Sequence, residues 1–508
     1  MPRLRSDVTE DLVRALTAAI RGPVTTRADR TASFGHDASH LSGRPLAVAA
    51  PSDPDDVVKL VRWARRAHIA LVPRGGGTSL DGESVPPDGA VVIDLSGWSR
   101  LLEVDPDGSW ARVEPGMVNW DLQRALLAHG LFFPPNPGSW TTSTIGGNVG
   151  TNASGPRSFR YGPTRAWVRE VEAVLGTADR VHLGSRVAKR SVGPDLLQLF
   201  IGSEGTLGIA TEVTVRLAPV PAVRKGVVVP LPRKVELGRL AALFCRIPES
   251  GLSAVEYLDR ECAAAIADRR KAHWPSDSAL LLLEVEAGDP SEADQRLGRV
   301  RRALATLDAA EGLAVFEDAD ELWTLRGTSG DVLQERFGLT VREDVAVPLA
   351  RVDALMTELD GIARREEVRY FLFGHLGEGS LHPNFALDPA SPAAARIRAA
   401  VLRTALSLGG TISSEHGVGR LKRAFLAEEL GASAVELLRA VKRACDPDGI
   451  LNPGKLYPDD ARAARRSSPS PSAPRGGRTR SGSPNAGRGS SARRNSSRDG
   501  RRKRAARP

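Results

Sequence analysis

Cysteine is scarce in this 508-residue sequence, which holds only Cys245, Cys262 and Cys445. The three form no C-x-x-C pair, which argues against a disulfide framework, a zinc ribbon and an iron–sulfur cluster in the chain. No apolar run is long enough to span a bilayer, and the first residues lack the apolar core of a signal peptide. We therefore expect a cytoplasmic protein, either free or peripheral to the inner face of the membrane, that needs another carrier for any redox chemistry.

Acidic residues are nearly absent from residues 461–508, which contain fifteen Arg or Lys and a single acid, Asp499. The net charge of +9 thus combines +14 in this tail with −5 in residues 1–460. Apart from these charges the tail is mostly Ser, Gly, Pro and Ala, which cannot bury enough surface to offset the entropy of ordering. We predict that residues 458–508 are disordered; they could contact nucleic acid or an anionic surface, or remain a solvated tail without a specific role.

The length and the 41% hydrophobic content indicate a globular protein of two or more domains. We expect an α+β architecture with an N-terminal helical segment (1–40), a first domain (41–221) and a second domain (222–457). Apolar spacing predicts a β-α-β unit and then a mixed α+β set in the first domain. Its expected strands are 46–49, 69–72, 91–94, 112–114, 168–175 and 208–217, and its expected helices are 53–67 and 120–129, after a leading helix at 6–20.

The second domain shows strands and helices in alternation, which predicts a sheet covered by helices on one face. A final helical portion ends where proline and glycine residues in the segment 446–455 prevent continuation. The expected strands are 227–231, 280–285 and 370–373, and the expected helices are 234–247, 291–311, 352–366, 393–408 and 423–444.

Two histidines, His375 and His382, lie in the glycine-punctuated run 373–385, and a Glu-His-Gly sequence begins at Glu415. Glycines between the histidines permit a tight reversal, so both imidazoles can face one cavity. Two His and one Glu leave a coordination position open on a metal, which allows it to hold substrate. His416 then remains as a candidate base, although a pair of histidines at this spacing is more often an ordinary set of core or surface residues.

Three glycine-rich loops stand in the first domain, at 73–82, 137–155 and 200–209. Consecutive glycines let backbone N–H groups converge on an anion, although one such loop alone is more often a flexible turn. The first loop has neither the Walker nor the G-x-G-x-x-G spacing. Together, three loops within one domain fit a dinucleotide with a large flat ring.

These motifs resemble the FAD-linked oxidases of the vanillyl-alcohol-oxidase type, which have a PCMH-type FAD-binding domain. Within them, the chain is similar to the D-2-hydroxy-acid dehydrogenases, which include glycolate, D-lactate and D-2-hydroxyglutarate enzymes. The sequences that carry the resemblance are Pro73-Arg-Gly-Gly-Gly-Thr-Ser, Thr144-Ile-Gly-Gly-Asn, Gly202-Ser-Glu-Gly-Thr-Leu-Gly-Ile, His375-x-Gly-x-Gly, Glu415-His-Gly and Ile450-Leu-Asn-Pro-Gly-Lys.

The resemblance implies a two-part FAD-binding domain, a C-terminal cap domain with an antiparallel sheet, and FAD as cofactor. Some relatives link FAD covalently through a His in the first loop; because Thr78 stands there, we expect non-covalent FAD. The cofactor-binding positions it implies are Pro73, Arg74, Gly75, Gly76, Gly77, Thr78, Ser79, Pro137, Gly138, Thr144, Ile145, Gly146, Gly147, Asn148, Asn152, Gly155, Tyr161, Gly162, Glu204, Gly205, Gly208, Ile209 and Asn452.

The resemblance also implies oxidation of a D-2-hydroxy acid to the 2-oxo acid by hydride transfer to FAD. His375, His382 and Glu415 would hold a divalent metal, Zn or Mn, and His416 would be the base. The implied substrate contacts are Arg326, Arg342 and Asn384. The electron acceptor is left open between quinone, an electron-transfer flavoprotein, oxygen and a partner subunit.

Alternatives remain open at several positions. Both arginines can be surface ion-pair residues, and Glu415 can cap a helix that begins at Gly417. Glu378 and Ser380 replace the commoner Asp and Asn between the two histidines, which alters the turn. A non-redox FAD enzyme of the alkylglycerone-phosphate synthase type is a rival, but the run of histidines usual there is missing.

Overall fold

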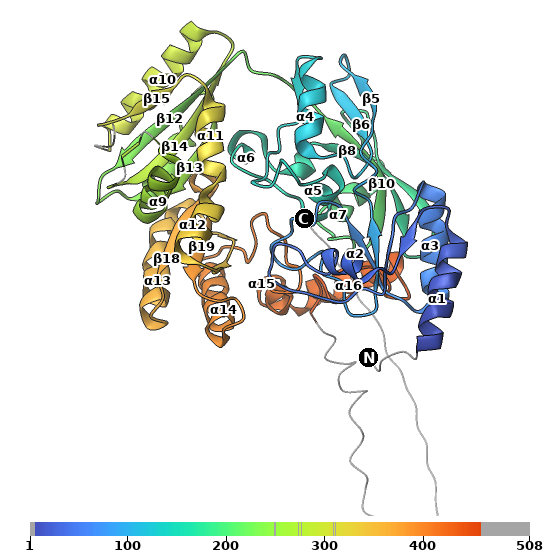
Figure 1. Ribbon diagram of the computed structural model, residues 1–508. Coiled ribbons are helices and arrows are strands. Elements are labelled where there is room, and N and C mark those ends of the chain that lie inside the picture. The colour runs from blue at the N-terminus through green and yellow to red at the C-terminus, as the bar shows by residue number, and fades with distance from the viewer. Residues whose placement is uncertain are drawn as a thin grey trace, which may run out of the picture. The chain divides into compact units, whose positions relative to one another are not determined.

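The computed structural model describes residues 6–458 except 248, 249, 273, 276, 308 and 310, and it describes the side chains of residues 6–9 in no detail. The predicted disordered tail, after its first residue, lies outside this part of the chain. The described residues contain three larger sheets, and Figure 1 shows the helices around them. Among the described residues, no helix has both the length and the apolar character needed to cross a bilayer.

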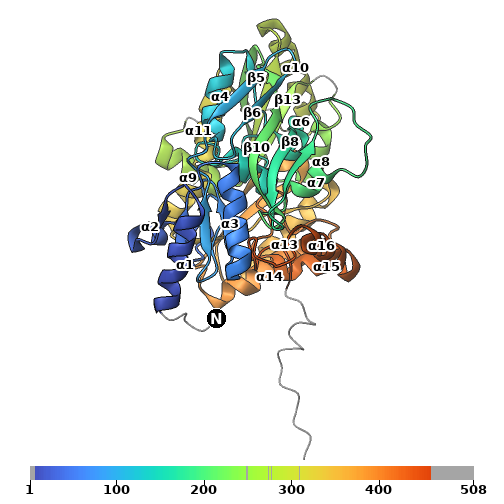
Figure 2. The same cartoon turned by 90° about the vertical axis from the view of Figure 1, so that its right-hand side faces the viewer.

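The first sheet contains the predicted β-α-β unit, in which two strands both pair in parallel with a third. Asp53 begins the connecting helix by accepting a hydrogen bond from the backbone N–H of Asp56 at 2.9 Å. The N-terminal helix packs beside that connecting helix, as Figure 2 shows. The elements are α1 (Ser6–Ala19), β1 (Val24–Thr25), α2 (Ala28–Ser33), β2 (Ala47–Ala49), α3 (Pro54–Ala67), β3 (Leu71–Arg74) and β4 (Val91–Asp94), with the strand order β1-β2-β4-β3.

The second sheet is antiparallel and has the order β5-β6-β10-β8-β9. Its three central strands were expected from the sequence, and the edge strands β5 and β9 were not. Its strands are β5 (Leu101–Asp105), β6 (Trp110–Val113), β8 (Val168–Leu175), β9 (Arg180–Gly184) and β10 (Gly208–Arg216). The accompanying elements are α4 (Asn119–Leu127), α5 (Ile145–Thr151), α6 (Ser158–Tyr161), η1 (Thr164–Ala166), α7 (Leu196–Phe200) and the short pair β7 (Leu131–Phe132) and β11 (Ala218–Pro219).

The third sheet belongs to the second half of the chain, and all its strand pairings among the described residues are antiparallel. Its path is β15-β12-β14-β13-β18-β19-β16, and β17 pairs with β19 off this path. Its strands are β12 (Val223–Leu231), β13 (Leu252–Leu258), β14 (Ala279–Ala287), β15 (Ala314–Phe316), β16 (Thr340–Arg342), β17 (Val345–Ala346), β18 (Tyr370–His375) and β19 (Ser380–Ala386).

Helices cover both faces of this sheet, so the expectation of helices on one face is wrong. Val227 and Val229 pack into one apolar cluster and Val228 into another, as alternation along a strand requires. The three helices on the second face are not among those predicted from the sequence. One face carries α8 (Leu237–Phe244), α10 (Pro290–Ala305), α13 (Val352–Arg365) and α14 (Pro392–Ser407), and the other carries α9 (Arg260–Arg270), α11 (Ala319–Gly327) and α12 (Ser329–Phe337).

The C-terminal segment returns to the first sheet, beside the N-terminal half of the chain (Figure 1). The single helix predicted over 423–444 is wrong, because Gly431 has a φ of 78° and separates α15 (Leu426–Leu430) from α16 (Ala432–Cys445). Beyond α16, Leu71 donates to the carbonyl of Ile450 and accepts from the N–H of Asn452, both at 2.8 Å. The return brings Asn452 next to the first glycine loop.

Candidate active site

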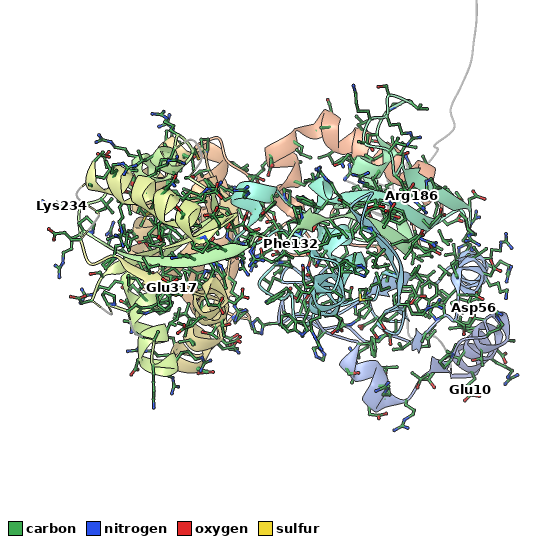
Figure 3. All side chains as sticks on the ribbon, turned by 90° about the horizontal axis from the view of Figure 1, so that it is seen from above. Glu10, Asp56, Phe132, Arg186, Lys234 and Glu317 are labelled. Atoms are coloured by element: carbon green, nitrogen blue, oxygen red, sulfur yellow. The ribbon has the colours of Figure 1, made fainter. Side chains whose placement is uncertain are left out.

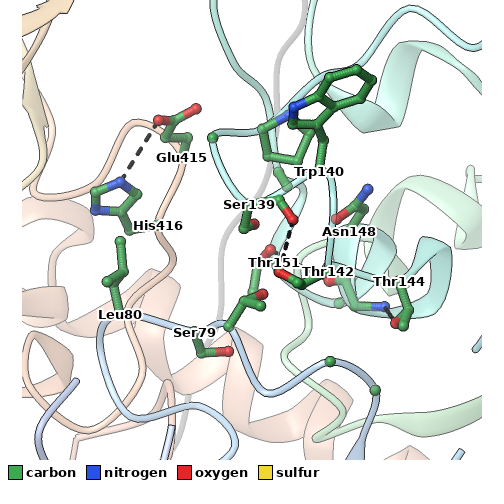
Figure 4. A pocket seen from close by; sticks show the side chains of 18 of the residues that line it. Ser79, Leu80, Ser139, Trp140, Thr142, Thr144, Asn148, Thr151, Glu415 and His416 are labelled. Atoms are coloured by element: carbon green, nitrogen blue, oxygen red, sulfur yellow. Dashed lines mark hydrogen bonds and ion pairs between the residues drawn. The ribbon is translucent and has the colours of Figure 1, made fainter. Parts of the chain in front are cut away.

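A cavity of about 990 Å³ lies between the glycine loops of the first half of the chain and the third sheet. Figure 4 shows Glu415 and His416 on one side of this pocket and Trp140, Asn148 and Thr151 on the other. The cavity wall includes these residues predicted for the site: Pro73, Arg74, Gly75, Gly76, Gly77, Thr78, Ser79, Pro137, Gly138, Thr144, Gly146, Gly147, Asn148, Glu204, Gly205, Gly208, Ile209, Arg326, Arg342, His375, His382, Asn384, Glu415, His416 and Asn452.

The first and second glycine loops touch through positions that tolerate no side chain. A Cβ on Gly75 would lie 2.1 Å from Thr144 Oγ1, and a Cβ on Gly76 would lie 2.3 Å from the carbonyl oxygen of Thr142. Gly77 has a φ of 65°, which favours glycine. Backbone from two loops is thereby packed into one wall, where N–H groups can approach a phosphate closely.

The second loop leads into α5, whose N-terminal end faces the cavity. Thr144 caps this helix by accepting the N–H of Gly147 at 3.2 Å. The Nδ2 of Asn148 is buried and has no hydrogen-bond partner among the described residues. An amide donor without a partner in the cavity wall is suited to bind a polar ligand atom, which fits the predicted cofactor.

The third loop packs against the first, and the C-terminal segment joins both. A Cβ on Gly205 would lie 2.5 Å from Pro73 Cγ. The Nδ2 of Asn452 donates to the carbonyls of Glu83, at 2.9 Å, and Glu204, at 2.7 Å. Asn452 lines the cavity, and its side-chain donor joins the third loop to the residue that directly follows the first loop.

Five residues predicted to bind the cofactor do not line the cavity. Ile145 is buried in the core of the second sheet, and Asn152 ends α5 with its Oδ1 accepting the N–H of Arg165. Tyr161 points to the second half of the chain, where its hydroxyl donates to Glu286 at 2.6 Å. The full set outside the cavity wall is Ile145, Asn152, Gly155, Tyr161 and Gly162.

The two histidines and the glutamate predicted as metal ligands converge. Glu415 Oε1 lies 3.1 Å from His375 Nε2 and 3.3 Å from His382 Nε2. Gly379, with a φ of 72°, reverses the chain between β18 and β19 and so places the two histidines side by side. No helix begins at Gly417, which removes the alternative that Glu415 is a helix cap.

A second triad shares a histidine with the first. The ring of His416 stacks on that of His382, with centroids 5.0 Å apart, and its Nε2 lies 3.7 Å from Glu415 Oε1. Asp344, His382 and His416 also bring one possible ligand atom each within 4.8 Å of one another. The predicted base thus lies directly beside the predicted metal ligands.

Sequence reasoning missed two buried carboxylates behind these histidines. Glu256 Oε1 accepts a hydrogen bond from His375 Nδ1, and Asp344 Oδ1 lies 3.4 Å from His382 Nδ1. Each Nδ1 thus faces its own carboxylate while both Nε2 atoms face Glu415. A lone acid inside the apolar strand Leu252–Leu258 was the available signal for Glu256, because an acid is rarely buried unless it is paired.

The pKa values in this cluster favour a positive charge at its centre. Burial lowers the pKa of His375, but Glu256 and Glu415 outweigh it and hold the value well above the ordinary one. Burial raises the pKa of Glu415, yet the two histidines hold it well below its ordinary value. Three carboxylates, of which Glu256 and Asp344 are fully buried, surround three imidazoles and suit a divalent cation, so the residues present fit a metal site.

The two arginines predicted to bind substrate differ in whether their guanidinium groups already pair with a carboxylate of the protein. Arg326 is buried, its Nε donates to Glu256 Oε2 at 2.8 Å, and its Nη2 lies 2.7 Å from the same oxygen, so it is no surface ion-pair residue. Arg342 donates to Gln334 Oε1 at 3.1 Å, and no carboxylate among the described residues pairs with it. Because its charge is half-buried and unmatched, Arg342 is the freer cation for an anionic substrate.

Asn384 completes the predicted substrate contacts. Its Nδ2 donates to the carbonyl of His382 at 2.8 Å, while its buried Oδ1 has no partner among the described residues. The amide is therefore fixed by the metal-site strand and presents an acceptor to the cavity.

The chain belongs to the FAD-linked oxidases, as its motifs predicted. Residues 221–456 match the family described as FAD linked oxidases, C-terminal domain, and residues 45–184 match the FAD binding domain. The cofactor that this family binds is FAD, so the protein is a flavoprotein oxidoreductase.

Its curated relatives are similar over nearly their full lengths. The glycolate oxidase subunit GlcD of Bacillus subtilis is 32% identical over 437 residues, which cover 84% of this chain and 93% of that protein. The D-2-hydroxyglutarate dehydrogenase of Stutzerimonas stutzeri is 32% identical over 450 residues, covering 86% and 96%. The D-lactate dehydrogenase of Archaeoglobus fulgidus is 31% identical over 414 residues, covering 80% and 90%.

Solved structures share the fold. A p-cresol methylhydroxylase with substrate bound superposes with a TM-score of 0.76 at 16% identity, covering 89% of this chain and 97% of that one. An alkyldihydroxyacetonephosphate synthase superposes with a TM-score of 0.68 at 17% identity, covering 89% and 85%. At these identities the likeness concerns the fold alone.

Proposed function

We propose that this protein oxidises a D-2-hydroxy acid, of the D-lactate, glycolate or D-2-hydroxyglutarate class, to the 2-oxo acid with FAD and a divalent metal. The observation that carries the proposal is the convergence of two sets of residues on one cavity. The glycine loops form one wall, and the His375, His382 and Glu415 cluster forms the other. Three relatives, which are named as a glycolate oxidase subunit, a D-2-hydroxyglutarate dehydrogenase and a D-lactate dehydrogenase, support the substrate class.

FAD supplies the hydride acceptor for this oxidation. The first loop, Pro73 to Ser79, would hold the phosphates, and Asn148 would donate its free amide hydrogen to the cofactor. Thr78, in place of the histidine that some family members use, leaves the cofactor without a covalent link. Trp140, across the pocket from Glu415, contributes an apolar wall that limits water (Figure 4).

His375, His382 and Glu415 would hold the metal, Zn or Mn, through two imidazole nitrogens and one carboxylate. The metal would bind the substrate hydroxyl and lower its pKa. His416 would remove that proton, because its ring stacks on a ligand and lines the same cavity.

Residues of the third sheet and its helices would orient the substrate. Arg342 would pair with a substrate carboxylate, since its guanidinium has no carboxylate partner among the described residues. Arg326 would contribute its remaining N–H groups, and Asn384 would accept a hydrogen bond through Oδ1. Burial lowers the pKa of Arg342, as expected for a cation held near an apolar cavity.

Electrons would leave the reduced cofactor to oxygen, a quinone, an electron-transfer flavoprotein or a partner subunit. Truncation after Asp460 tests whether the basic segment 461–508 takes part. Lower retention on nucleic acid or anionic vesicles, with unchanged turnover, would assign it to binding. Unchanged retention and turnover would leave it without a role in either.

The direct test is anaerobic mixing of the FAD-loaded, metal-loaded protein with D- and L-2-hydroxy acids, followed by flavin absorbance. Bleaching by D-lactate, glycolate or D-2-hydroxyglutarate is expected, with appearance of the 2-oxo acid. Absence of bleaching by every 2-hydroxy acid would contradict the proposal and favour the non-redox alternative of the alkylglycerone-phosphate synthase type.

A further inference from the structure

Glu256 links two parts of the site that lie on different elements. It stands on β13, is fully buried, and has both carboxylate oxygens engaged. Oε1 accepts from Nδ1 of His375 on β18, and Oε2 accepts from Nε of Arg326 on α11 and forms an ion pair with its Nη2. One carboxylate therefore touches a proposed metal ligand and a proposed substrate contact at once.

The position of Glu256 follows from the sheet register. Its neighbour Tyr257 pairs with Gly374, the residue before His375, so β13 presents Glu256 beside that histidine. Arg326 is held from its other side as well, with its guanidinium carbon 4.6 Å from the centre of the Phe373 ring. Both partners are therefore fixed by surrounding structure, and the carboxylate has little freedom to turn away.

The tautomer of His375 depends on what faces its Nδ1. With a metal bound, the proton that stays on His375 is the one on Nδ1, because the Glu256 carboxylate there only accepts, and the lone pair of Nε2, which lies 3.1 Å from Glu415 Oε1, would be available to the ion. A ligating histidine needs this arrangement, because the nitrogen that binds the metal must be free of hydrogen. Arg326 only donates, and so it keeps the second oxygen of Glu256 occupied.

We propose that Glu256 is a positioning residue that holds His375 in its metal-binding tautomer, while Arg326 fixes the orientation of the Glu256 carboxylate. The inference rests on the proposed function, since it assumes a metal on His375. It adds that Arg326 acts on the metal site through Glu256, beyond any contact with the substrate.

The substitution Glu256→Gln tests this because the amide has one acceptor and one donor. Arg326 takes the acceptor, so the NH2 group faces His375 and forces the proton to Nε2, as a wrong tautomer does in other catalytic histidines. We expect the dissociation constant of Zn²⁺ or Mn²⁺ to rise about 10- to 100-fold in the FAD-bound protein, measured by competition with a chromogenic chelator.

Three further variants sharpen the result. Asp259→Asn changes a half-buried carboxylate that follows the same strand and caps α9, and metal affinity should stay unchanged. Glu256→Gln with Arg326→Met frees the amide to turn its oxygen to His375, so affinity should recover by roughly tenfold. Glu256→Met leaves the Arg326 charge unmatched but offers no amide donor, and it should weaken binding less than Glu256→Gln.

The metal-affinity measurements distinguish a wrong role for Glu256 from a wrong metal site. A Glu256→Gln protein with wild-type metal affinity, or a double variant no tighter than the single one, would overturn the role of Glu256 alone. Equal loss in Glu256→Met and Glu256→Gln would assign the effect to charge and also overturn the tautomer control. Wild-type protein that binds neither Zn²⁺ nor Mn²⁺ would overturn this inference together with the metal part of the proposed function.

Discussion

Asp344 fixes the main chain of His416: its Oδ2 accepts the backbone N–H of His416 at 2.9 Å. The same oxygen accepts the N–H groups of Ser414 and Glu415, also at 2.9 Å each. One buried carboxylate therefore orders the loop that carries both a proposed metal ligand and the proposed base. The base is positioned by backbone hydrogen bonds, which a substitution of its own side chain leaves in place.

Replacing His416 should therefore remove the base without removing the site. For His416→Asn we expect the rate of flavin reduction by substrate to fall about 10²- to 10⁴-fold, because proton removal contributes about that factor. FAD content and metal content should match the wild-type protein. Anaerobic stopped-flow absorbance measures the rate, and a wild-type rate in this variant would exclude the base assignment.

Arg342 should govern substrate affinity more than stability. Arg342→Met removes a cation that pairs with no carboxylate among the described residues, so no buried acid is left unmatched. We expect the substrate dissociation constant to rise about 10- to 100-fold, since a charge-assisted hydrogen bond contributes about 1.5–3 kcal/mol.

The matched comparison is Arg326→Met, which leaves the buried carboxylate of Glu256 without its cation. That variant should lose thermal stability, whereas Arg342→Met should not. Substrate titration of the FAD absorbance and thermal denaturation together check both statements. Equal substrate affinity in Arg342→Met and wild type would contradict the assignment of Arg342.

The sequence alone predicts the site residues that lie together within short segments of the chain. The glycine loops and the His375 to His382 turn are visible because glycine positions and ligand types lie within short segments, and most of those residues do line the cavity. Glu256 and Asp344 were missed because only the folded chain brings them to their partners: Glu256 and His375 are 119 residues apart, and Asp344 and His416 are 72 residues apart.

The fold of the second half was harder to predict for a related reason. The strand Leu252–Leu258 is buried along its whole length, so it shows no alternation of apolar and polar residues. Helix Arg260–Arg270, rich in charge, shows only a weak apolar stripe and was also unassigned. Because a helix with so weak an apolar stripe is not visible in the sequence, the sequence predicts helices on one face of the sheet only.

Metal removal should separate the chemical step from cofactor binding. Dialysis against a chelator should lower the rate of flavin reduction by substrate at least about 100-fold, because the hydroxyl proton is then removed from an unactivated alcohol. FAD should stay bound, because no predicted metal ligand lies in the glycine loops, and dithionite should still bleach it. Adding back Zn²⁺ or Mn²⁺ should restore the rate; unchanged turnover without metal would contradict the metal's role.

Asp56 should be important for the stability of the N-terminal part. Its buried Oδ2 accepts the backbone N–H groups of Arg21, Gly22 and Ser52 at 3.0–3.1 Å, and Figure 3 marks its place near α1. Asp56→Ala leaves three N–H groups without this acceptor, at a cost of about 3 kcal/mol. Thermal denaturation of the FAD-bound protein measures the loss, and an unchanged midpoint would contradict it.

The difference in stability between the wild type and Asp56→Asn should depend on pH, because only the wild type carries an ionisable carboxyl at this position. Burial raises the pKa of Asp56, but the N–H groups of Ser52, Arg21 and Gly22, with Lys59 nearby, outweigh burial and hold the pKa below its ordinary value. A lowered pKa in the folded state stabilises the protein fully above the unfolded value of about 3.9, and this contribution is lost as the pH falls through the folded value. The thermal midpoint of the wild type should therefore be higher than that of Asp56→Asn. The difference between the two midpoints should be constant between pH 5 and 7 and should shrink below about pH 4. A difference that grows on acidification would show that the carboxyl is not stabilised in its ionised form.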